Sequence, residues 1–315
     1  MTVARGLLLV GLHMTLHPAV GMAETTSTRP AGTVELIQDA NFRRGFEVYD
    51  PKPGKHVVRG LMRIDPDADE PIWGLAQWSS RYTLAGVPAE RLASGAVRFA
   101  DQAKAVTFTP AGDGLIFTLN GRREYGERFR RADEPWAHLL AEQRFADHPR
   151  VVDLERLRFR IECRLRSVKD YAPPDADLPG QAAQFLAYVT VQNLNRQSPG
   201  YGDYLWFGVQ MYDSRYREPK AHAAADTGTG KFIYNPPGSA YTPASTHDGE
   251  WITIDRDLLP LIHEGLKTAW DQDHLKQSRD LNDFRLGGFN IGWELPGTLD
   301  VEIEFRKLSL EAVSK

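Results

Sequence analysis

Two runs of alternating side chains, separated by a short polar turn, constrain the fold of this chain more than any other stretch. They span residues 185–193 and 204–213. Successive side chains of a β-strand point to opposite faces of its sheet. In the second run Leu205, Phe207 and Val209 share one apolar face, while Gly208 lies on a face of rings and an amide. The pattern predicts two strands joined by a turn, with one face in a core.

The other face of the second run is the first indication of a ligand. Tyr204, Trp206, Gln210 and Tyr212 share it, whereas a solvated strand face usually carries Lys, Glu and Thr. Flat rings stack on the C–H faces of sugars, and amides bond sugar hydroxyl groups. The pattern therefore predicts a carbohydrate ligand, and it leaves open whether the protein only binds this ligand or also cleaves it.

Composition excludes several other classes of protein. The 315 residues carry a formal net charge of −4, which excludes a strongly basic nucleic-acid-binding or polybasic membrane protein. Hydrophobic residues make up 42% of the chain, enough for a globular core. Cys163 is the only cysteine, so an intramolecular disulfide and a thiolate zinc cluster are both excluded. We expect Cys163 to be a buried structural thiol.

The N-terminal residues have the pattern of an export signal. Arg5 precedes an apolar run at 6–16, and Gly21-Met22-Ala23 supplies small residues for cleavage. We predict a signal peptide at 1–23, a disordered lead-in at 24–32 and a single domain at 33–315. No later run is apolar enough for a membrane span. The protein is therefore expected to be periplasmic or secreted.

The rest of the chain reads as a β-sandwich with two inserted α-helices and long loops. Asp133 and Pro135 predict a helix that begins there and runs to about Phe145. Apolar residues at helical spacing predict a second helix at 258–270. Asn120-Gly121 predicts a hairpin turn. Further strands are expected at 34–37, 45–49, 56–64, 96–109, 114–119, 122–129, 157–167, 250–254, 284–294 and 299–310.

The closing quarter of the chain carries a family resemblance. Residues 284–294, then Gly297 and 301–310, resemble the last strands of jelly-roll carbohydrate-binding modules, and residues 249–255 resemble the strand before them. The resemblance implies an all-β jelly-roll sandwich, a fold common in polysaccharide binding and in some glycoside hydrolases and lyases. It transfers no catalytic residue to this chain.

Several strands combine an apolar face with a polar one, and these polar faces form one groove if the strands are neighbours. Arg160, Glu162 and Arg164 alternate on one strand, and Asn290 and Glu294 on another. The alternative is that the charges on the first strand form a solvated ladder and that the rings pack under a long loop. The predicted substrate-binding residues are Arg160, Arg164, Tyr188, Gln192, Tyr204, Trp206, Gln210, Tyr212 and Asn290.

Hydrolysis of a glycosidic bond requires two carboxyl groups that flank it. The predicted catalytic residues are Glu162, Asp213 and Glu294, and Asp203 is a further candidate. Glu162 is attractive because arginines beside it would tune its pKa, although an ion pair with Arg160 or Arg164 is the favoured explanation. Uronic-acid substrates would give the arginines a role as carboxylate clamps. A lyase would instead need a base, for which Tyr204, Tyr212 and His222 are candidates.

The remaining motifs indicate no cofactor. Phe232 follows Gly228-Thr229-Gly230-Lys231 where a phosphate-binding loop requires Ser or Thr. Asp300, Glu302 and Glu304 alternate along one strand, which predicts a solvated face and leaves a structural Ca²⁺ as the alternative. We predict an exported protein that binds a polysaccharide or oligosaccharide, with cleavage of this ligand left open. The alternative is a non-catalytic structural or interaction protein of the cell envelope.

Overall fold

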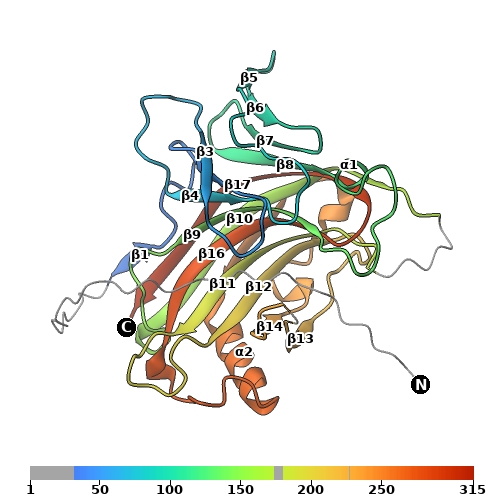
Figure 1. Cartoon of the computed structure of the whole chain (residues 1–315). Coiled ribbons are helices and arrows are strands. Elements are labelled where there is room, and N and C mark those ends of the chain that lie inside the picture. Colours follow the sequence, from blue (N-terminus) through green and yellow to red (C-terminus); the bar gives the residue numbers. More distant parts are fainter. Residues whose placement is uncertain (1–31, 174–179, 227) are drawn as a thin grey trace.

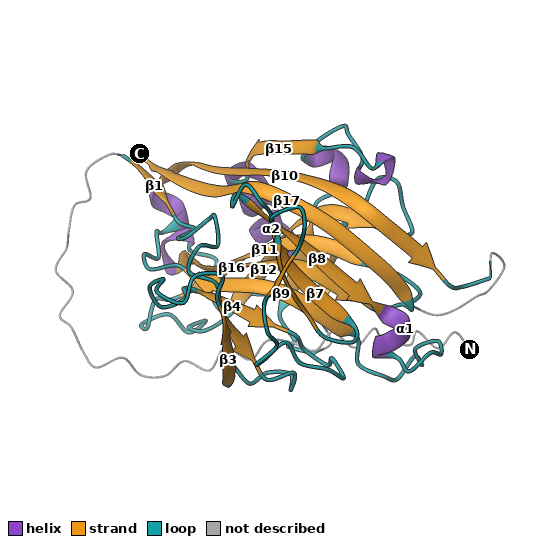
Figure 2. Cartoon of the chain, turned by 90° about the horizontal axis from the view of Figure 1, so that it is seen from above, coloured by secondary structure: helices purple, strands orange, loops and turns teal. Residues whose placement is uncertain are grey.

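The protein is an all-β jelly-roll sandwich of two sheets, as expected from the sequence. The computed structural model describes residues 32–173, 180–226 and 228–315. The predicted signal peptide, and residues 24–31 of the predicted lead-in, lie outside them. Figures 1 and 2 show the two layers, with β10 and β17 in one layer and β11, β12 and β16 in the other.

One layer is an eight-stranded sheet built around two long strands, β10 and β17, which pair antiparallel over most of their length. A short strand, β1 (Thr33–Glu35), also pairs with β17. The other strands follow in the order β15 (Ile252–Asp257), β10 (Leu154–Asp170), β17 (Leu299–Ser314), β8 (Gly114–Asn120), β7 (Lys104–Phe108), β6 (Val97–Ala100) and β5 (Glu90–Arg91).

The other layer is a nine-stranded sheet with the expected pair of strands at its centre. The second strand of this pair has the predicted boundaries, and the first begins one residue earlier than predicted. The order is β13 (His222–Ala225), β14 (Phe232–Asn235), β12 (Tyr204–Asp213), β11 (Gln184–Asn193), β16 (Phe284–Leu295), β9 (Ala137–Arg144), β4 (Trp73–Ala76), β2 (Phe46–Tyr49) and β3 (Val58–Met62).

The core lies between the two sheets and is rich in aromatic rings. Phe185 and Trp293 approach to 5.2 Å between ring centroids, and Phe117 and Phe305 to 5.3 Å. All four are completely buried. Edge-to-face contacts of this kind stabilise a core beyond the area they bury. Cys163 is buried in the same core, as expected, and burial raises the pKa of its thiol to about 12.

The second predicted helix is present, and the first is not. Helix α2 (Leu259–Asp271) buries Ile262 and Leu266 against the sandwich. The other α-helix is a single turn, α1 (Gly121–Glu124), where a hairpin and a strand were expected. No helix among the described residues is long and apolar enough to cross a membrane. Four 3₁₀ turns complete the helical segments: Val151–Asp153, Gly238–Ala240, Thr246–Asp248 and Leu281–Asp283.

The helix predicted at 133–145 is wrong, because most of this segment is strand β9 in the middle of the nine-stranded sheet. Leu139 and Ala141 face the core, and Leu140 joins an apolar cluster on the outer face. A strand that is covered on both faces has no alternation to reveal it. Its helix-favouring residues form a strand because tertiary packing overrides local propensity.

Candidate functional site on the outer face of the nine-stranded sheet

Strand register places most of the predicted site residues on one surface, the side of the nine-stranded sheet that faces away from the core. We call this surface the outer face. Gln184 lies opposite Asp213 on one side and Glu294 on the other. Asn290 likewise lies beside Tyr188. The carboxyl, amide and phenol groups of β11, β12 and β16 are thus neighbours, which meets the condition that the sequence analysis set for one shared polar face.

The rings on this face are not the open stacking platform that the sequence predicted. Tyr204 and Trp206 are 9% and 8% exposed. The ring centroid of Trp206 lies 5.2 Å from that of Tyr204 and 5.5 Å from that of Tyr188. The absence of a side chain at Gly208 was expected to leave a gap in the middle of this face. The side chain of Asn235 fills this gap, since a Cβ at Gly208 would lie 2.1 Å from Oδ1 of Asn235. The rings form a second small core.

Tyr212 does not belong to the outer face, and its predicted place there is wrong. A register shift pairs Phe185 with Tyr212 but Leu186 with Gln210, so one extra residue enters the second strand. Such a bulge reverses the direction of the side chains that follow it. The Tyr212 ring consequently lies 5.7 Å from that of Trp293 in the core.

A cavity of about 320 Å³ opens beside this second core. This volume lies at the lower end of the range for small-molecule sites. Buried carboxyl, amide and aromatic groups line it, and exposed cationic groups complete it. Its lining residues are Trp136, Gln184, Leu186, Tyr188, Gln210, Asp213, Arg215, Tyr216, Lys220, Ala221, His222, Ile233, Asn235 and Glu294.

Glu294 is the chemically distinctive group of this cavity. Its side chain is buried, and burial together with the negative charge of Asp226 raises its pKa to about 8. The carboxyl group is therefore mainly protonated at neutral pH. Its neighbour in register, His138, has a pKa lowered by burial to about 4 and is neutral there. Burial, with the charge of Glu294 as the next cause, raises the pKa of the Tyr188 phenol.

Buried polar atoms without a hydrogen-bond partner gather on this face. Eight such side-chain atoms occur among the described residues. Two belong to residues that line the cavity, Nε1 of Trp136 and Oδ1 of Asn235. Buried polar groups are nearly always bonded, so each unpaired one calls for a partner such as a water molecule or a ligand. Three more lie on the same sheet: Nε1 of Trp78, Nδ1 of His138 and Oε2 of Glu142.

Glu142 marks the far side of the outer face. It lies opposite Asn290 on the neighbouring strand. Its Oε1 lies 2.8 Å from Nε2 of His56, whose ring meets those of Tyr49 and Trp78 at 5.1 and 5.4 Å. The sequence analysis missed this pair because its members are far apart in the chain and neither belongs to a motif.

Asp213 lines the same cavity as Glu294, but its oxygens are already bonded. Arg215 donates from Nε to Oδ1 at 2.9 Å and from Nη2 to Oδ2 at 2.6 Å. Gln184 donates to Oδ2 at 3.0 Å. The structure thus brings together two of the three predicted catalytic carboxyl groups, and it assigns Asp213 a positioning contact with arginine. Asp203, the further candidate, pairs with Lys231.

Asp226 is the carboxyl group that the sequence analysis overlooked. It lies between β13 and β14, and its charge acts on Glu294, Tyr188 and Tyr204. Its oxygens accept hydrogen bonds from the backbone N–H groups of Gly228 and Thr229 at 3.2 and 2.8 Å. Its signal in the sequence is the glycine-rich run that follows it, which lacks the pattern of a phosphate-binding loop.

Arg160, Glu162 and Arg164 lie on the opposite side of the molecule, so the predicted groove that included them is wrong. Their strand, β10, belongs to the eight-stranded sheet. Glu162 accepts hydrogen bonds from Lys307 and Arg306 at 2.7 and 2.8 Å, and both contacts hold its pKa low. Arg164 pairs with Glu304, and Arg160 lies 3.4 Å from Asp255. The alternative of a solvated charge ladder describes this strand.

Gln192 and Asn290 occupy other parts of the outer face. The amide of Gln192 donates to Oγ1 of Thr190 at 2.9 Å and packs against Gly287. Neither Gln192 nor Asn290 lines the cavity. They belong to the same face as Glu294 but do not contribute to the walls of this pocket.

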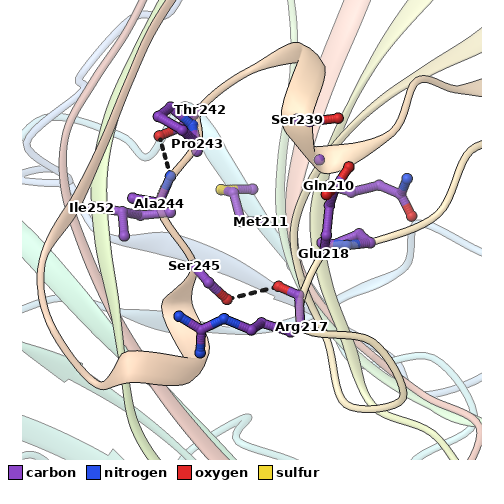
Figure 3. A pocket seen from close by; sticks show the side chains of 12 residues that line it. Gln210, Met211, Arg217, Glu218, Ser239, Thr242, Pro243, Ala244, Ser245 and Ile252 are labelled. Atoms are coloured by element: carbon purple, nitrogen blue, oxygen red, sulfur yellow. Dashed lines mark hydrogen bonds between the residues drawn. The ribbon is translucent and has the colours of Figure 1, made fainter.

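A second, smaller cavity of about 190 Å³ lies beyond Gln210, which borders both cavities. Figure 3 shows Met211 among the side chains that line it, of which Ser239, Thr242 and Ser245 bear hydroxyl groups. These polar groups mostly bond to the protein itself. Ser245 Oγ donates to the carbonyl of Arg217 at 2.7 Å, and Thr242 Oγ1 accepts from the N–H of Ala244. This cavity offers a ligand fewer free groups than the first.

The carboxylates of β17 are engaged by neighbouring side chains. Asp300 accepts from the Tyr171 hydroxyl at 2.6 Å, and Glu302 accepts from Arg166 at 2.9 Å. In residues 32–173, 180–226 and 228–315, no group of three or more His, Cys, Asp or Glu side chains is arranged to hold a metal ion. The alternative of a structural Ca²⁺ at this strand therefore has no observation in its favour.

Comparison with known proteins identifies no family for this chain. No protein-family model matches the chain, and no curated protein matches its sequence. Similar solved structures include endoglucanase Cel12A from Rhodothermus marinus, at 11% identity and a TM-score of 0.38, covering 73% of this chain and 97% of that chain. A metagenome-derived glycoside hydrolase family 12 endoglucanase has 13% identity and a TM-score of 0.38, with coverages of 78% and 100%.

A native family 12 xyloglucanase from Bacillus licheniformis is also similar, with 8% identity and a TM-score of 0.41. The comparison covers 76% of this chain and 99% of that chain. At these values the likeness transfers neither a substrate nor a residue role. The function of this chain must be argued from its own side chains.

Proposed function

We propose that this protein binds an oligosaccharide segment of a polysaccharide on the outer face and hydrolyses a glycosidic bond there. The observation that carries the proposal is Glu294, a buried carboxylic acid that stays protonated at neutral pH and lines a cavity of suitable size. A glycosidic oxygen leaves as a hydroxyl group only if it receives a proton. Glu294 is the acid that gives this proton.

Hydrolysis also needs a second carboxyl group with a different role. We assign that role to Asp226, whose negative charge raises the pKa of Glu294. Two carboxyl groups with opposite protonation states divide the acid and base roles between them. The hydrogen bonds from Gly228 and Thr229 orient the Asp226 carboxylate. In this scheme Asp226 acts on the sugar or on the attacking water while Glu294 protonates the leaving oxygen.

The unpartnered atoms of the cavity supply the binding groups. Asn235 presents Oδ1 as an acceptor for a sugar hydroxyl, and Trp136 presents Nε1 as a donor. Pairing them with a ligand removes a penalty of about 1–3 kcal/mol for each buried unpaired group. Sugars carry both donors and acceptors on neighbouring carbons, which suits this arrangement. Export, expected from residues 1–23, belongs to the same proposal, because extended polysaccharides lie outside the cytoplasm.

The test is an assay of reducing ends released from a panel of neutral and acidic polysaccharides. We expect activity in the wild type and a loss of about 10²- to 10⁴-fold in Glu294→Gln, the range for general acid catalysis. Binding should persist in this variant, measured as retarded migration in gels that contain the glycan. Glu162→Gln is the matched control on the opposite sheet and should keep full activity.

The remaining outcomes separate hydrolysis from binding alone. Asp226→Asn should also lose activity while keeping the fold, which circular dichroism checks. Full activity of Glu294→Gln would remove Glu294 from the reaction and overturn the assignment. Retarded migration without product in the wild type would overturn hydrolysis and leave a binding protein. Neither product nor retardation with any glycan would overturn the whole proposal and favour a structural role in the envelope.

A further inference from the structure

The chain that follows β12 carries two cationic side chains and a histidine to the cavity. Arg215, Lys220 and His222 line the cavity, and all three are exposed. The groups deeper in the cavity, such as Glu294 and Asn235, are buried. A ligand that enters this cavity therefore meets Arg215 and Lys220 at its mouth before it reaches the carboxylic acid.

Arg215 is held in place before any ligand arrives. Its two hydrogen bonds to Asp213 fix the plane of the guanidinium group, and Gln184 fixes Asp213 in turn. The backbone N–H of Arg215 also donates to Oδ1 of Asp213, at 3.0 Å. A guanidinium group has five N–H donors, and these side-chain bonds use two of them. The others remain to bond an acceptor in the cavity.

Lys220 is positioned by its surroundings rather than by an acid. Its Nζ lies 4.0 Å from the centroid of the Tyr216 ring, a favourable cation–π distance. Its backbone carbonyl accepts from Nε2 of Gln210 at 2.8 Å. Within the described ranges Lys220 makes no ion pair with a carboxylate. Its positive charge is thus unmatched at the edge of the cavity.

The charges that line the cavity leave a positive excess near neutral pH. The negative charge of Asp213 is matched by Arg215. Glu294 is mainly protonated, and the pKa of His222 is lowered by burial and by the charge of Arg215, so both are mainly neutral. Among the lining residues this leaves the charge of Lys220, while Asp226, whose negative charge acts on Glu294, is not one of the lining residues. The whole chain has a formal net charge of −4, so a locally positive cavity runs against the overall balance.

We propose that the bound sugar chain carries carboxylate groups, as uronic acids do, and that Lys220 and Arg215 bind one of them at the mouth of the cavity. This inference rests on the proposed function and specifies its substrate class. Charge-assisted hydrogen bonds to a carboxylate are about twice as strong as neutral ones. A carboxylate held at the mouth also places the neighbouring hydroxyl groups toward Asn235 and Trp136, which border the same cavity.

The experiment compares a uronic-acid oligosaccharide with its carboxyl-reduced neutral counterpart, which has the same length and linkage. Isothermal titration calorimetry should show tighter binding of the acidic ligand to the wild type. Lys220→Gln should weaken that binding about tenfold and leave binding of the neutral ligand unchanged. Lys267→Gln, which removes an exposed lysine on α2, is the matched control and should change neither. Added salt should weaken binding of the acidic ligand more strongly than binding of the neutral ligand.

The possible results distinguish this inference from the function beneath it. Equal affinity for the acidic and neutral ligands, unchanged in Lys220→Gln, would overturn the inference and leave the proposed function standing. Binding of neither ligand would count against the proposed function as well. The same oligosaccharide of neutral sugars can also be tested with sulfate groups attached. If this sulfated ligand binds as tightly as the uronic-acid ligand, the choice of carboxylate is overturned, because the mouth of the cavity would then recognise any anion.

Discussion

The two sheets of this protein turn opposite kinds of polar surface outward. On β10 and β17 the charged side chains are partly exposed and paired, as in the contacts between Glu162 and Arg306 and between Arg164 and Glu304. On the outer face of the nine-stranded sheet the polar groups are buried, and several, including Oδ1 of Asn235 and Nδ1 of His138, have no partner. Polar residues are therefore exposed and paired on one face, and buried and partly unpaired on the other.

The difference teaches which polar residues indicate function. An exposed ion pair contributes little to stability and keeps its solvation, so it is compatible with an ordinary surface. A buried polar group without a partner costs about 1–3 kcal/mol and persists only where something else requires it. By this criterion the cavity that Asn235, Trp136 and Glu294 line is the better candidate for a ligand site, while Glu162 belongs to a solvated ladder.

The largest effect that separates the faces is expected from their tryptophans. Trp206→Ala removes a ring packed against Tyr188 and Tyr204, and should lower the free energy of unfolding by about 3–5 kcal/mol. Trp251 is half-buried between the guanidinium groups of Arg164 and Arg306 on the other sheet. Trp251→Ala should cost about 1 kcal/mol. Urea denaturation measures the free energy of unfolding of both variants. Equal losses of this free energy would contradict the difference between the two faces.

An intermediate effect is expected in the pH dependence of stability. The pKa of Glu294 is raised from its ordinary 4.5 to about 8. Between these values the folded state keeps a proton that the unfolded state loses, so this group makes the free energy of unfolding fall as the pH rises. Glu294→Gln should remove that fall. Urea denaturation of both proteins between pH 4 and pH 9, as a rough range around these values, measures the difference.

Glu162 should show the opposite dependence, which sharpens the contrast. Lys307 and Arg306 hold its pKa below the ordinary value, so its contribution is present above that value and is lost as the pH falls. Glu162→Gln should therefore be less stable than wild type near neutral pH. At strongly acidic pH, where Glu162 is protonated in the wild type, the two proteins should have similar stability. Identical pH profiles for the Glu294 and Glu162 variants would contradict the distinction between the two faces.

The smallest effect is expected from a single ion pair of the ladder. A double-mutant cycle with Glu162→Gln and Arg306→Gln should give a coupling energy below about 1 kcal/mol, and added salt should reduce it. The contact is short, at 2.8 Å, but both side chains reach solvent. A coupling energy of several kcal/mol would show that the ladder is a structural element in its own right.

Much of the fold could be predicted because the two faces of several strands carry different kinds of side chain, which gives the sequence a period of two. The alternation in 204–213 gave the bounds of β12, and the alternation in 284–294 gave β16 to within one residue. The sequence also identified Glu294 as a candidate acid, since its side chain is a carboxyl group in any fold. Helix α2 was predicted for a similar reason, because it buries one face only.

The pairing of the strands could not be predicted, and the site depends on it. The alternation of β10 is as clear as that of β12, yet β10 lies in the other sheet, so Glu162 and Glu294 face away from each other. The bulge that turns Tyr212 inward is a matter of register between two strands. Local periodicity carries no information on either point.

The sequence by itself determined an all-β sandwich, the positions of most strands and the set of groups available for chemistry. Only the tertiary structure decided which of those groups meet. Burial raises the pKa of Glu294 and leaves Asn235 and Trp136 unpaired, and the charge of Asp226 adds to the first effect. The physical reason is that desolvation and charge–charge contact depend on neighbours in space, and those neighbours come from strands far apart in the chain.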